Sequence, residues 1–108
     1  MKIVVSGTGY VGLVTAVCLA EKGNNVVCYD VVKEKIDTLN QGKSPIYEHG
    51  LEELMEKNKG KIIYTLDKKL AYKDADVIFI GVGTPERIDG SANLDFVYAV
   101  ADDIVENI

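Results

Sequence analysis

Cysteine is scarce in this chain of 108 residues, because Cys18 and Cys28 are the only two. They form no CxxC pair, which excludes a disulfide framework and a cysteine-based metal site. We predict no metal site in the chain. We expect both cysteines to be reduced, half-buried thiols of a cytoplasmic protein.

Basic residues are also fewer than acidic ones. Twelve lysines and arginines stand against seventeen aspartates and glutamates, which gives a formal net charge of −5. An acidic chain lacks the basic surface that nucleic acid binding requires. We therefore expect no nucleic acid partner, and any bound nucleotide should be held mainly by backbone amides.

Long apolar runs are missing as well. The apolar stretch after Lys2 is interrupted at residues 6–9 and again at Gly12, so it lacks the continuous centre of a signal peptide. No stretch reaches the length that spans a membrane. We expect no membrane contact and a cytoplasmic location. Hydrophobic residues at 47% and charged residues at 27% are typical of a folded globular protein.

Short apolar and β-branched runs alternate with helical patterns along the chain. We predict strands at residues 2–6, 25–30, 62–65 and 76–81, the last being the most buried. We predict helices at residues 10–23, 31–40, 49–59, 67–73 and from 94 to Ile108. Strands alternating with helices predict a parallel α/β sheet. The last helix has no cap, so we expect the chain to be part of a longer protein.

The strongest motif is a GxGxxG pattern between a predicted strand and a predicted helix, Gly7-Thr8-Gly9-Tyr10-Val11-Gly12. In this dinucleotide fingerprint the first glycine permits a tight turn. The second lets the backbone approach a pyrophosphate, and the third lets the helix pack closely on the strand. The free amides at the helix N-terminus then hold the phosphates. We predict a Rossmann-type, doubly wound parallel sheet, incomplete, with about four strands in the order 3-2-1-4.

An acidic residue supports the fingerprint. Asp30 lies 18 residues after Gly12, at the end of the second predicted strand. A carboxylate there accepts hydrogen bonds from the adenosine ribose hydroxyls. It also repels a 2′-phosphate, so NAD is the expected cofactor in preference to NADP. The alternative is that Asp30 only caps a turn.

A second signal, Gly81-Val82-Gly83-Thr84-Pro85, follows the fourth predicted strand. In an open α/β sheet, ligands bind outside the carboxyl ends of the strands, where the strand order reverses. The first and fourth strands flank that point, so we expect Thr84 to face the same crevice as Gly9 and Val11. Alternatively, the glycines and the proline only end the strand.

Together these residues resemble the N-terminal NAD-binding domain of the nucleotide-sugar dehydrogenases, the UDP-glucose/GDP-mannose dehydrogenase family. The resemblance runs along all 108 residues, and its more specific strings are Pro45-Ile46-Tyr47-Glu48 and Gly83-Thr84-Pro85. His49 departs from the family pattern, which usually has proline there. The resemblance implies that residues 1–108 are a partial NAD-binding domain. It also implies that a central helix and a C-terminal substrate and catalytic domain lie outside this chain.

The resemblance also implies the cofactor contacts. It places the backbone of Tyr10 and Val11 at the pyrophosphate. It places Asp30 and Lys35 at the adenosine ribose, and Thr84 against the cofactor. From the sequence alone, Lys35 would otherwise be read as a solvated charge on a helix.

The reaction that the resemblance implies is oxidation of UDP-glucose to UDP-glucuronate with two NAD, by a homo-oligomeric enzyme of polysaccharide biosynthesis. A cysteine of a later domain captures the intermediate aldehyde in that family. Neither Cys18 nor Cys28 matches its position, so we expect no catalytic residue in this chain. The alternatives are a GDP-mannose or UDP-N-acetylmannosamine dehydrogenase, or a non-catalytic nucleotide-sensing module.

Overall fold

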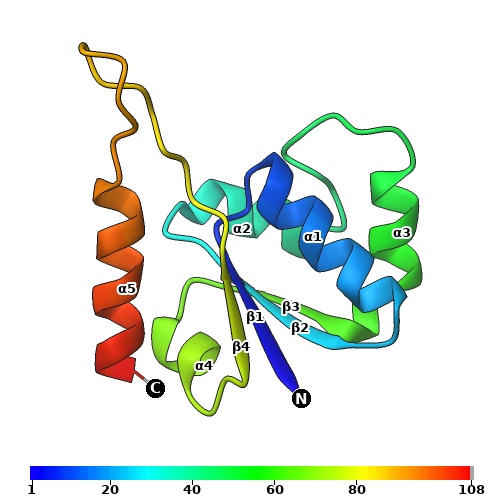
Figure 1. Ribbon diagram of the computed structural model, residues 1–108. Coiled ribbons are helices and arrows are strands. Elements are labelled where there is room, and N and C mark those ends of the chain that lie inside the picture. The colour runs from blue at the N-terminus through cyan, green and yellow to red at the C-terminus, as the bar shows by residue number, and fades with distance from the viewer. Residues whose placement is uncertain (108) are drawn as a thin grey trace.

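The computed structural model describes residues 1–107, so Ile108, the predicted end of the last helix, lies outside the described residues. Strands and helices alternate through this part of the chain (Figure 1). The elements are β1 (Lys2–Ser6), α1 (Tyr10–Glu21), β2 (Asn25–Tyr29), α2 (Lys33–Asn40), α3 (Leu51–Lys57), the 3₁₀ helix η1 (Lys59–Lys61), β3 (Ile62–Thr65), α4 (Lys68–Tyr72), β4 (Val77–Ile80) and α5 (Asp95–Asn107). Across residues 1–107, every helix is too short or too polar to cross a bilayer.

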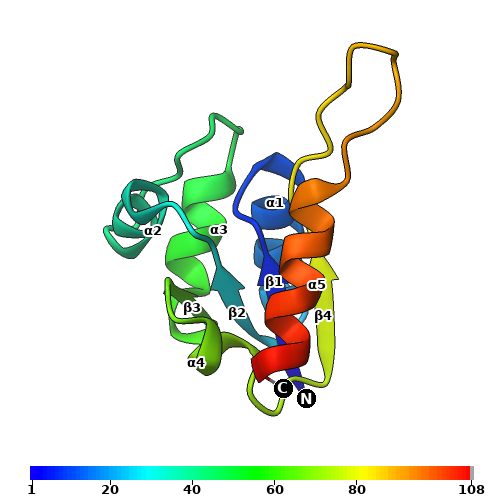
Figure 2. The same cartoon turned by 90° about the vertical axis from the view of Figure 1, so that its left-hand side faces the viewer.

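The four strands are parallel and lie in the order β3-β2-β1-β4, which confirms the predicted order. The chain runs outward from β1 to β3 and then crosses back to the other side of β1. Since parallel crossovers are right-handed, this reversal puts the later helices on the opposite face of the sheet. Figure 2 shows α5 in front of the sheet and α1 behind it. The sheet is therefore doubly wound, as predicted.

The first face of the sheet, covered by α1, α2 and α3, carries the larger core. Ile36 and Leu39 point into it from α2, and Leu51 and Met55 point into it from α3, as their helical spacing predicts. The buried members of this core are Val5, Leu13, Ala16, Val17, Ala20, Val26, Cys28, Ile36, Leu39, Leu51, Met55 and Ile62.

The second face, covered by α4 and α5, carries a smaller core. Its buried members are Val4, Val27, Tyr29, Ala71 and Tyr72. The helix α5 is less tightly packed, because Val100 is its only buried residue among residues 95–107. An ion pair between Lys68 Nζ and Asp103 Oδ1, 3.2 Å apart, joins α5 to α4.

The prediction that residues 76–81 form the most buried strand is wrong. Phe79 and Ile80 are each 41% exposed, and Val77 and Ile78 are only partly buried. The apolar run is typical of a central strand, but β4 is the edge of the sheet and pairs only with β1. The helices of the first face follow β1 and β2, so the outer part of β4 stays exposed.

The two cysteines are free, but the prediction that both are half-buried is also wrong. Cys18 is exposed on the outer side of α1, whereas Cys28 points from β2 into the larger core and is fully buried. Burial raises the pKa of the Cys28 thiol to about 12, so it stays protonated at neutral pH.

Backbone approaches backbone where β1, α1 and β4 meet. Gly7 has φ +104°, and a Cβ there would lie 2.7 Å from the Gly81 carbonyl oxygen. A Cβ on Gly12 would lie 2.0 Å from the Gly7 carbonyl oxygen. Both positions therefore exclude any side chain, which confirms that the third glycine of the motif allows the helix to pack closely on the strand.

We predict that Gly12→Ala destabilises the fold by about 3 kcal/mol or more, because the new methyl group overlaps a backbone oxygen that cannot move alone. Urea unfolding of the full chain measures this loss. Gly60→Ala is the matched control, since a Cβ at Gly60 would meet no atom within 4 Å. Equal stability of the two variants would contradict the close-packing explanation.

Candidate functional site

A hollow of about 430 Å³ lies at the carboxyl ends of β1 and β4, where the strand order reverses. Its walls come from the glycine turn after β1, the end of β2, the exit of β4 and the first turns of α5. In open parallel sheets this reversal point is where ligands bind. The lining residues are Ser6, Gly7, Thr8, Gly9, Tyr29, Asp30, Val31, Val32, Lys35, Gly81, Val82, Gly83, Phe96 and Val100.

The N-terminus of α1 opens at this hollow without a cap. Gly9 is its N-cap residue, and no side chain accepts a hydrogen bond from the first turn. The first amides of a helix have no intrahelical partner, and the helix dipole favours an anion beside them. A Cβ on Gly9 would meet no atom within 4 Å, and the φ of −75° at Gly9 also suits any residue. The space beside Gly9 is therefore open, and an uncapped helix N-terminus of this kind suits an anion such as phosphate.

Asp30 is the acidic group of the hollow and is only 8% exposed. The backbone N–H and the hydroxyl of Thr8 donate to its Oδ2 at 2.8 and 2.7 Å, and the backbone N–H of Val32 donates to its Oδ1 at 3.0 Å. Burial acts to raise the pKa of Asp30. These hydrogen bonds and the charge of Lys35 outweigh burial and hold the pKa below its usual value. Asp30 is therefore an ionised acceptor whose orientation is already fixed.

Apolar side chains form the part of the hollow between β2 and α5. Val31 is 76% exposed and Phe96 is 56% exposed, while Tyr29 and Val100 are buried behind them. Exposed apolar side chains around a hollow suit a flat, aromatic ligand group. Sequence reasoning missed this wall, although the apolar spacing of the last helix was visible in the sequence.

The structure brings four of the predicted cofactor residues to the hollow. Gly7, Gly9, Asp30 and Lys35 all line it, although they come from two separate segments of the chain. Thr8 lines it as well and was missed as a site residue. Its signal was its place inside the glycine motif, where a hydroxyl can reach the acid that ends the next strand.

The other predicted cofactor residues lie beside the hollow and do not line it. Tyr10 and Val11 are 55% and 69% exposed on the first turn of α1. Gly12 is buried behind Gly7. Thr84 is exposed and belongs to the segment between β4 and α5, which projects from the body in Figure 1.

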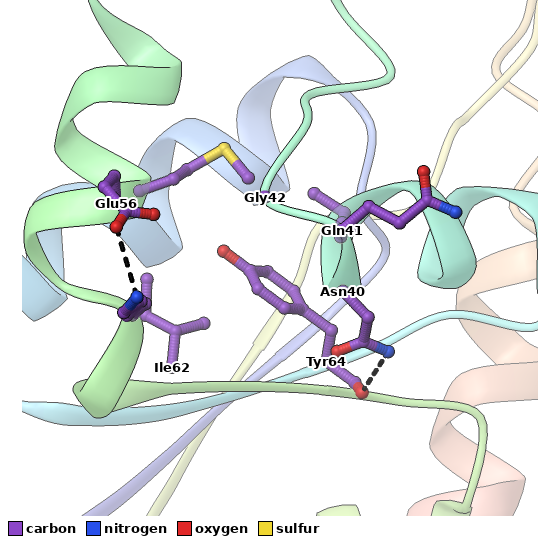
Figure 3. Close-up of a pocket in the computed structure, with 9 residues that line it drawn as sticks. Asn40, Gln41, Gly42, Glu56, Ile62 and Tyr64 are labelled. Atoms are coloured by element: carbon purple, nitrogen blue, oxygen red, sulfur yellow. Dashed lines mark hydrogen bonds and ion pairs between the residues drawn. The ribbon is translucent and has the colours of Figure 1, made fainter.

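A second hollow of about 250 Å³ lies between α2, α3 and β3, away from the reversal point (Figure 3). The charged groups at its rim, Glu56 and Lys59, are exposed and pair with each other at 3.2 Å. Asn40 donates to the backbone carbonyl of Tyr64 at 3.4 Å. Within residues 1–107, no group of three His, Cys, Asp or Glu side chains is arranged to hold a metal ion. The hollow at the reversal point is therefore the better candidate site.

Comparisons with known proteins agree with this geometry. The chain is 47% identical to a UDP-glucose 6-dehydrogenase of Bacillus subtilis, over 100% of the chain and 25% of the relative. A ternary complex of GDP-mannose dehydrogenase from Pseudomonas aeruginosa matches with a TM-score of 0.91 and 45% identity, over 96% of the chain and 24% of that structure. The UDP-N-acetyl-mannosamine dehydrogenase Cap5O from Staphylococcus aureus matches with a TM-score of 0.92 and 31% identity, over 100% and 26%.

The chain thus spans about a quarter of the length of these relatives. The sequence model of one family matches every residue from 1 to 108. The predicted resemblance is confirmed, and with it the expected cofactor, NAD. The chain belongs to the UDP-glucose/GDP-mannose dehydrogenase family and matches its NAD binding domain.

Proposed function

We propose that residues 1–108 hold NAD in the hollow at the reversal point and are the N-terminal, NAD-binding part of an oxidoreductase that converts UDP-glucose to UDP-glucuronate. The observation that carries this proposal is the pairing of two features across one hollow. An uncapped helix N-terminus faces open space, and an ionised, oriented carboxylate lies on the neighbouring strand end. The first suits a pyrophosphate, and the second suits a ribose diol.

Different residues around the hollow would bind different parts of the dinucleotide. The α1 amides from Tyr10 onward, with Val11, would bind the pyrophosphate. Asp30 would accept from a ribose hydroxyl at Oδ1, which now accepts one hydrogen bond, whereas Oδ2 already accepts two. Lys35 would support the ribose from α2, and Thr84 would lie against the cofactor farther along.

The adenine would lie against the apolar wall between Val31 and Phe96. When bound, NAD supplies a hydride acceptor, while these residues only bind and orient it. No catalytic residue is proposed within residues 1–108.

The incomplete sheet supports assigning the chain as one part of a larger domain. The edge strand β4 exposes Phe79 and Ile80, and an apolar edge strand of a parallel sheet is usually covered or paired with a further strand. We propose that the missing strands, a central helix and the substrate domain belong to the same protein, because the relatives are about four times as long.

The choice of UDP-glucose rests on similarity alone. UDP-glucose 6-dehydrogenases are 47% and 48% identical to the chain, whereas a GDP-mannose 6-dehydrogenase is 45% identical. A GDP-mannose dehydrogenase is therefore the second candidate. A nucleotide-sensing module would share the glycine turn and Asp30, but the family match along the whole chain favours the dehydrogenase.

Gly9→Val separates binding from folding. The new side chain enters open space, so we expect thermal stability close to that of the wild type. The same side chain would occupy the proposed pyrophosphate position, so NAD binding should fall below detection. Isothermal titration with NAD measures affinity, and a thermal melt without ligand checks the fold. NAD binding that survives in a folded Gly9→Val chain would remove the helix N-terminus from the site.

Asp30→Asn tests the ribose contact while keeping the shape of the side chain. We expect NAD affinity to fall by about 1–3 kcal/mol, the scale of losing charge-assisted hydrogen bonds. The wild type should prefer NAD to NADP, and the variant should narrow that preference because the repelling charge is gone. Asp37→Asn is the control, since Asp37 pairs with Lys33 on the exposed side of α2. Unchanged NAD affinity in Asp30→Asn would exclude the ribose contact.

The substrate proposal is tested by the appearance of NADH. Residues 1–108 alone, given NAD and UDP-glucose, should produce none. A polypeptide that carries this chain together with a substrate domain should reduce NAD with UDP-glucose and not with GDP-mannose. Turnover by residues 1–108 alone would place the nucleophile in this chain, and turnover with GDP-mannose alone would favour the second candidate.

A further inference from the structure

A pair of hydroxyl groups is buried directly below the glycine turn. Ser6 Oγ and Tyr72 Oη lie 2.6 Å apart, although 66 residues separate them in the chain. Both residues are 0% exposed, and Tyr72 is the largest fully buried side chain of residues 1–107. Ser6 is the last residue of β1, and Tyr72 is the last residue of α4. The proposed cofactor contacts use neither group.

The surroundings of this pair are mostly apolar. The other buried residues of the second core are Val4, Val27, Tyr29 and Ala71. A buried hydroxyl costs free energy unless it is hydrogen-bonded, whereas two apolar side chains would fill the same volume without that requirement. The hydrogen bond therefore adds a defined distance and orientation between β1 and α4, which apolar packing alone would leave less specified.

Ser6 connects the hydroxyl pair to the site, because it directly precedes Gly7, the first residue of the glycine turn. The Ser6 carbonyl accepts from Gly81 N–H at 2.7 Å, and Gly7 N–H donates to the Tyr29 carbonyl at 2.7 Å. The Tyr72 ring packs against the Tyr29 ring with centroids 5.4 Å apart. Asp30 follows Tyr29 directly. Ser6 is thus held by β4 through its backbone and by α4 through its side chain, one residue before the turn.

Ser6 borders the hollow, but both residues are 0% exposed and their hydroxyls bond to each other. The influence of the pair on a ligand therefore passes mainly through the backbone. We propose that Tyr72 is a positioning residue for dinucleotide binding. Its hydroxyl, through Ser6, holds the carboxyl end of β1 so that the glycine turn presents the α1 amides to the pyrophosphate. This inference rests on the proposed function, because it requires NAD in the hollow.

Tyr72→Phe removes one oxygen and keeps the ring that packs on Tyr29. If the hydroxyl holds the turn in its binding geometry, the variant populates that geometry less often, and its apparent affinity falls by the same fraction. Losing one such hydrogen bond corresponds to about a fivefold weaker affinity for NAD. Ser6→Ala should weaken NAD binding similarly. The double variant should add little, because both substitutions break the same bond.

Tyr64→Phe is the matched control. It removes a phenol oxygen from β3 on the first face of the sheet, where Tyr64 lines the second hollow (Figure 3). Its NAD affinity should equal that of the wild type. A comparison of ADP with adenosine locates the effect, because a displaced turn weakens the ligand that carries a pyrophosphate and spares the one that does not.

Titration of the full chain with NAD, ADP and adenosine, with thermal melts of every variant, decides between the outcomes. Weaker NAD and ADP binding by Tyr72→Phe, with unchanged adenosine binding, supports the positioning role. A lower melting temperature with unchanged NAD affinity would make the pair merely structural and overturn it, as would equal losses for ADP and adenosine. If Tyr72→Phe does not fold, Ser6→Ala gives the same decision. A wild-type chain that binds no NAD would instead overturn the proposed function.

Discussion

The contact on which the rest of the structure depends is the meeting of three backbone segments at Gly7, Gly12 and Gly81. No side chain fits at Gly7 or Gly12, and a Cβ on Gly81 would lie only 3.1 Å from the Gly12 Cα. This closeness lets α1 start directly after the end of β1, while β4 lies beside β1 on the side opposite β2. The strand order reverses here, so the same contact creates the hollow and brings the N-terminus of α1 to its edge. Gly9 differs from these glycines, because neither its φ nor its neighbours require glycine. The fold does not require glycine at position 9, so the lack of a side chain there serves the proposed site.

Asp30 shows that capping a turn and binding a ligand are compatible roles for one carboxylate. It ties the glycine turn to the start of α2 by accepting three hydrogen bonds from Thr8 and Val32. These bonds keep it ionised despite its burial, and they fix its direction before any ligand arrives. A carboxylate oriented in this way loses little side-chain entropy on binding a ribose. The structure therefore shows the turn-capping role of Asp30, and this role is compatible with the proposed ribose contact.

Local patterns were enough to predict much of the fold and part of the site. The glycine motif and the positions of the strands follow from residues close together in the chain, whereas the strand order follows from the fold that the motif indicates. Gly7, Gly9, Asp30 and Lys35 reach the hollow together, although Lys35 was expected only from the family resemblance. Burial was predicted less well, because it depends on neighbours from elsewhere in the fold. The apolar run of β4 is the same whether the strand is central or at the edge, and Phe79 is exposed on the edge strand, where the helices give little cover. The Ser6–Tyr72 pair joins residues 66 positions apart and has no sequence pattern of its own.

The two faces of the sheet have unequal cores, and this bears on how the site would respond to its ligand. The first face buries three helices against the sheet, whereas α5 on the second face has one buried residue and an ion pair to α4. The hollow lies between the well-packed part of the molecule and this less tightly packed helix, which supplies Phe96 and Val100.

An aromatic group bound there would bury part of Phe96, which is 56% exposed, and would add apolar contact between α5 and the end of β2. Binding and the packing of α5 would then stabilise each other, since a ligand that binds only the folded arrangement shifts the equilibrium toward it. The glycine turn and Asp30 are instead already held by backbone and side-chain hydrogen bonds. The proposed phosphate and ribose ends of the site would therefore be more preorganised than the proposed base end.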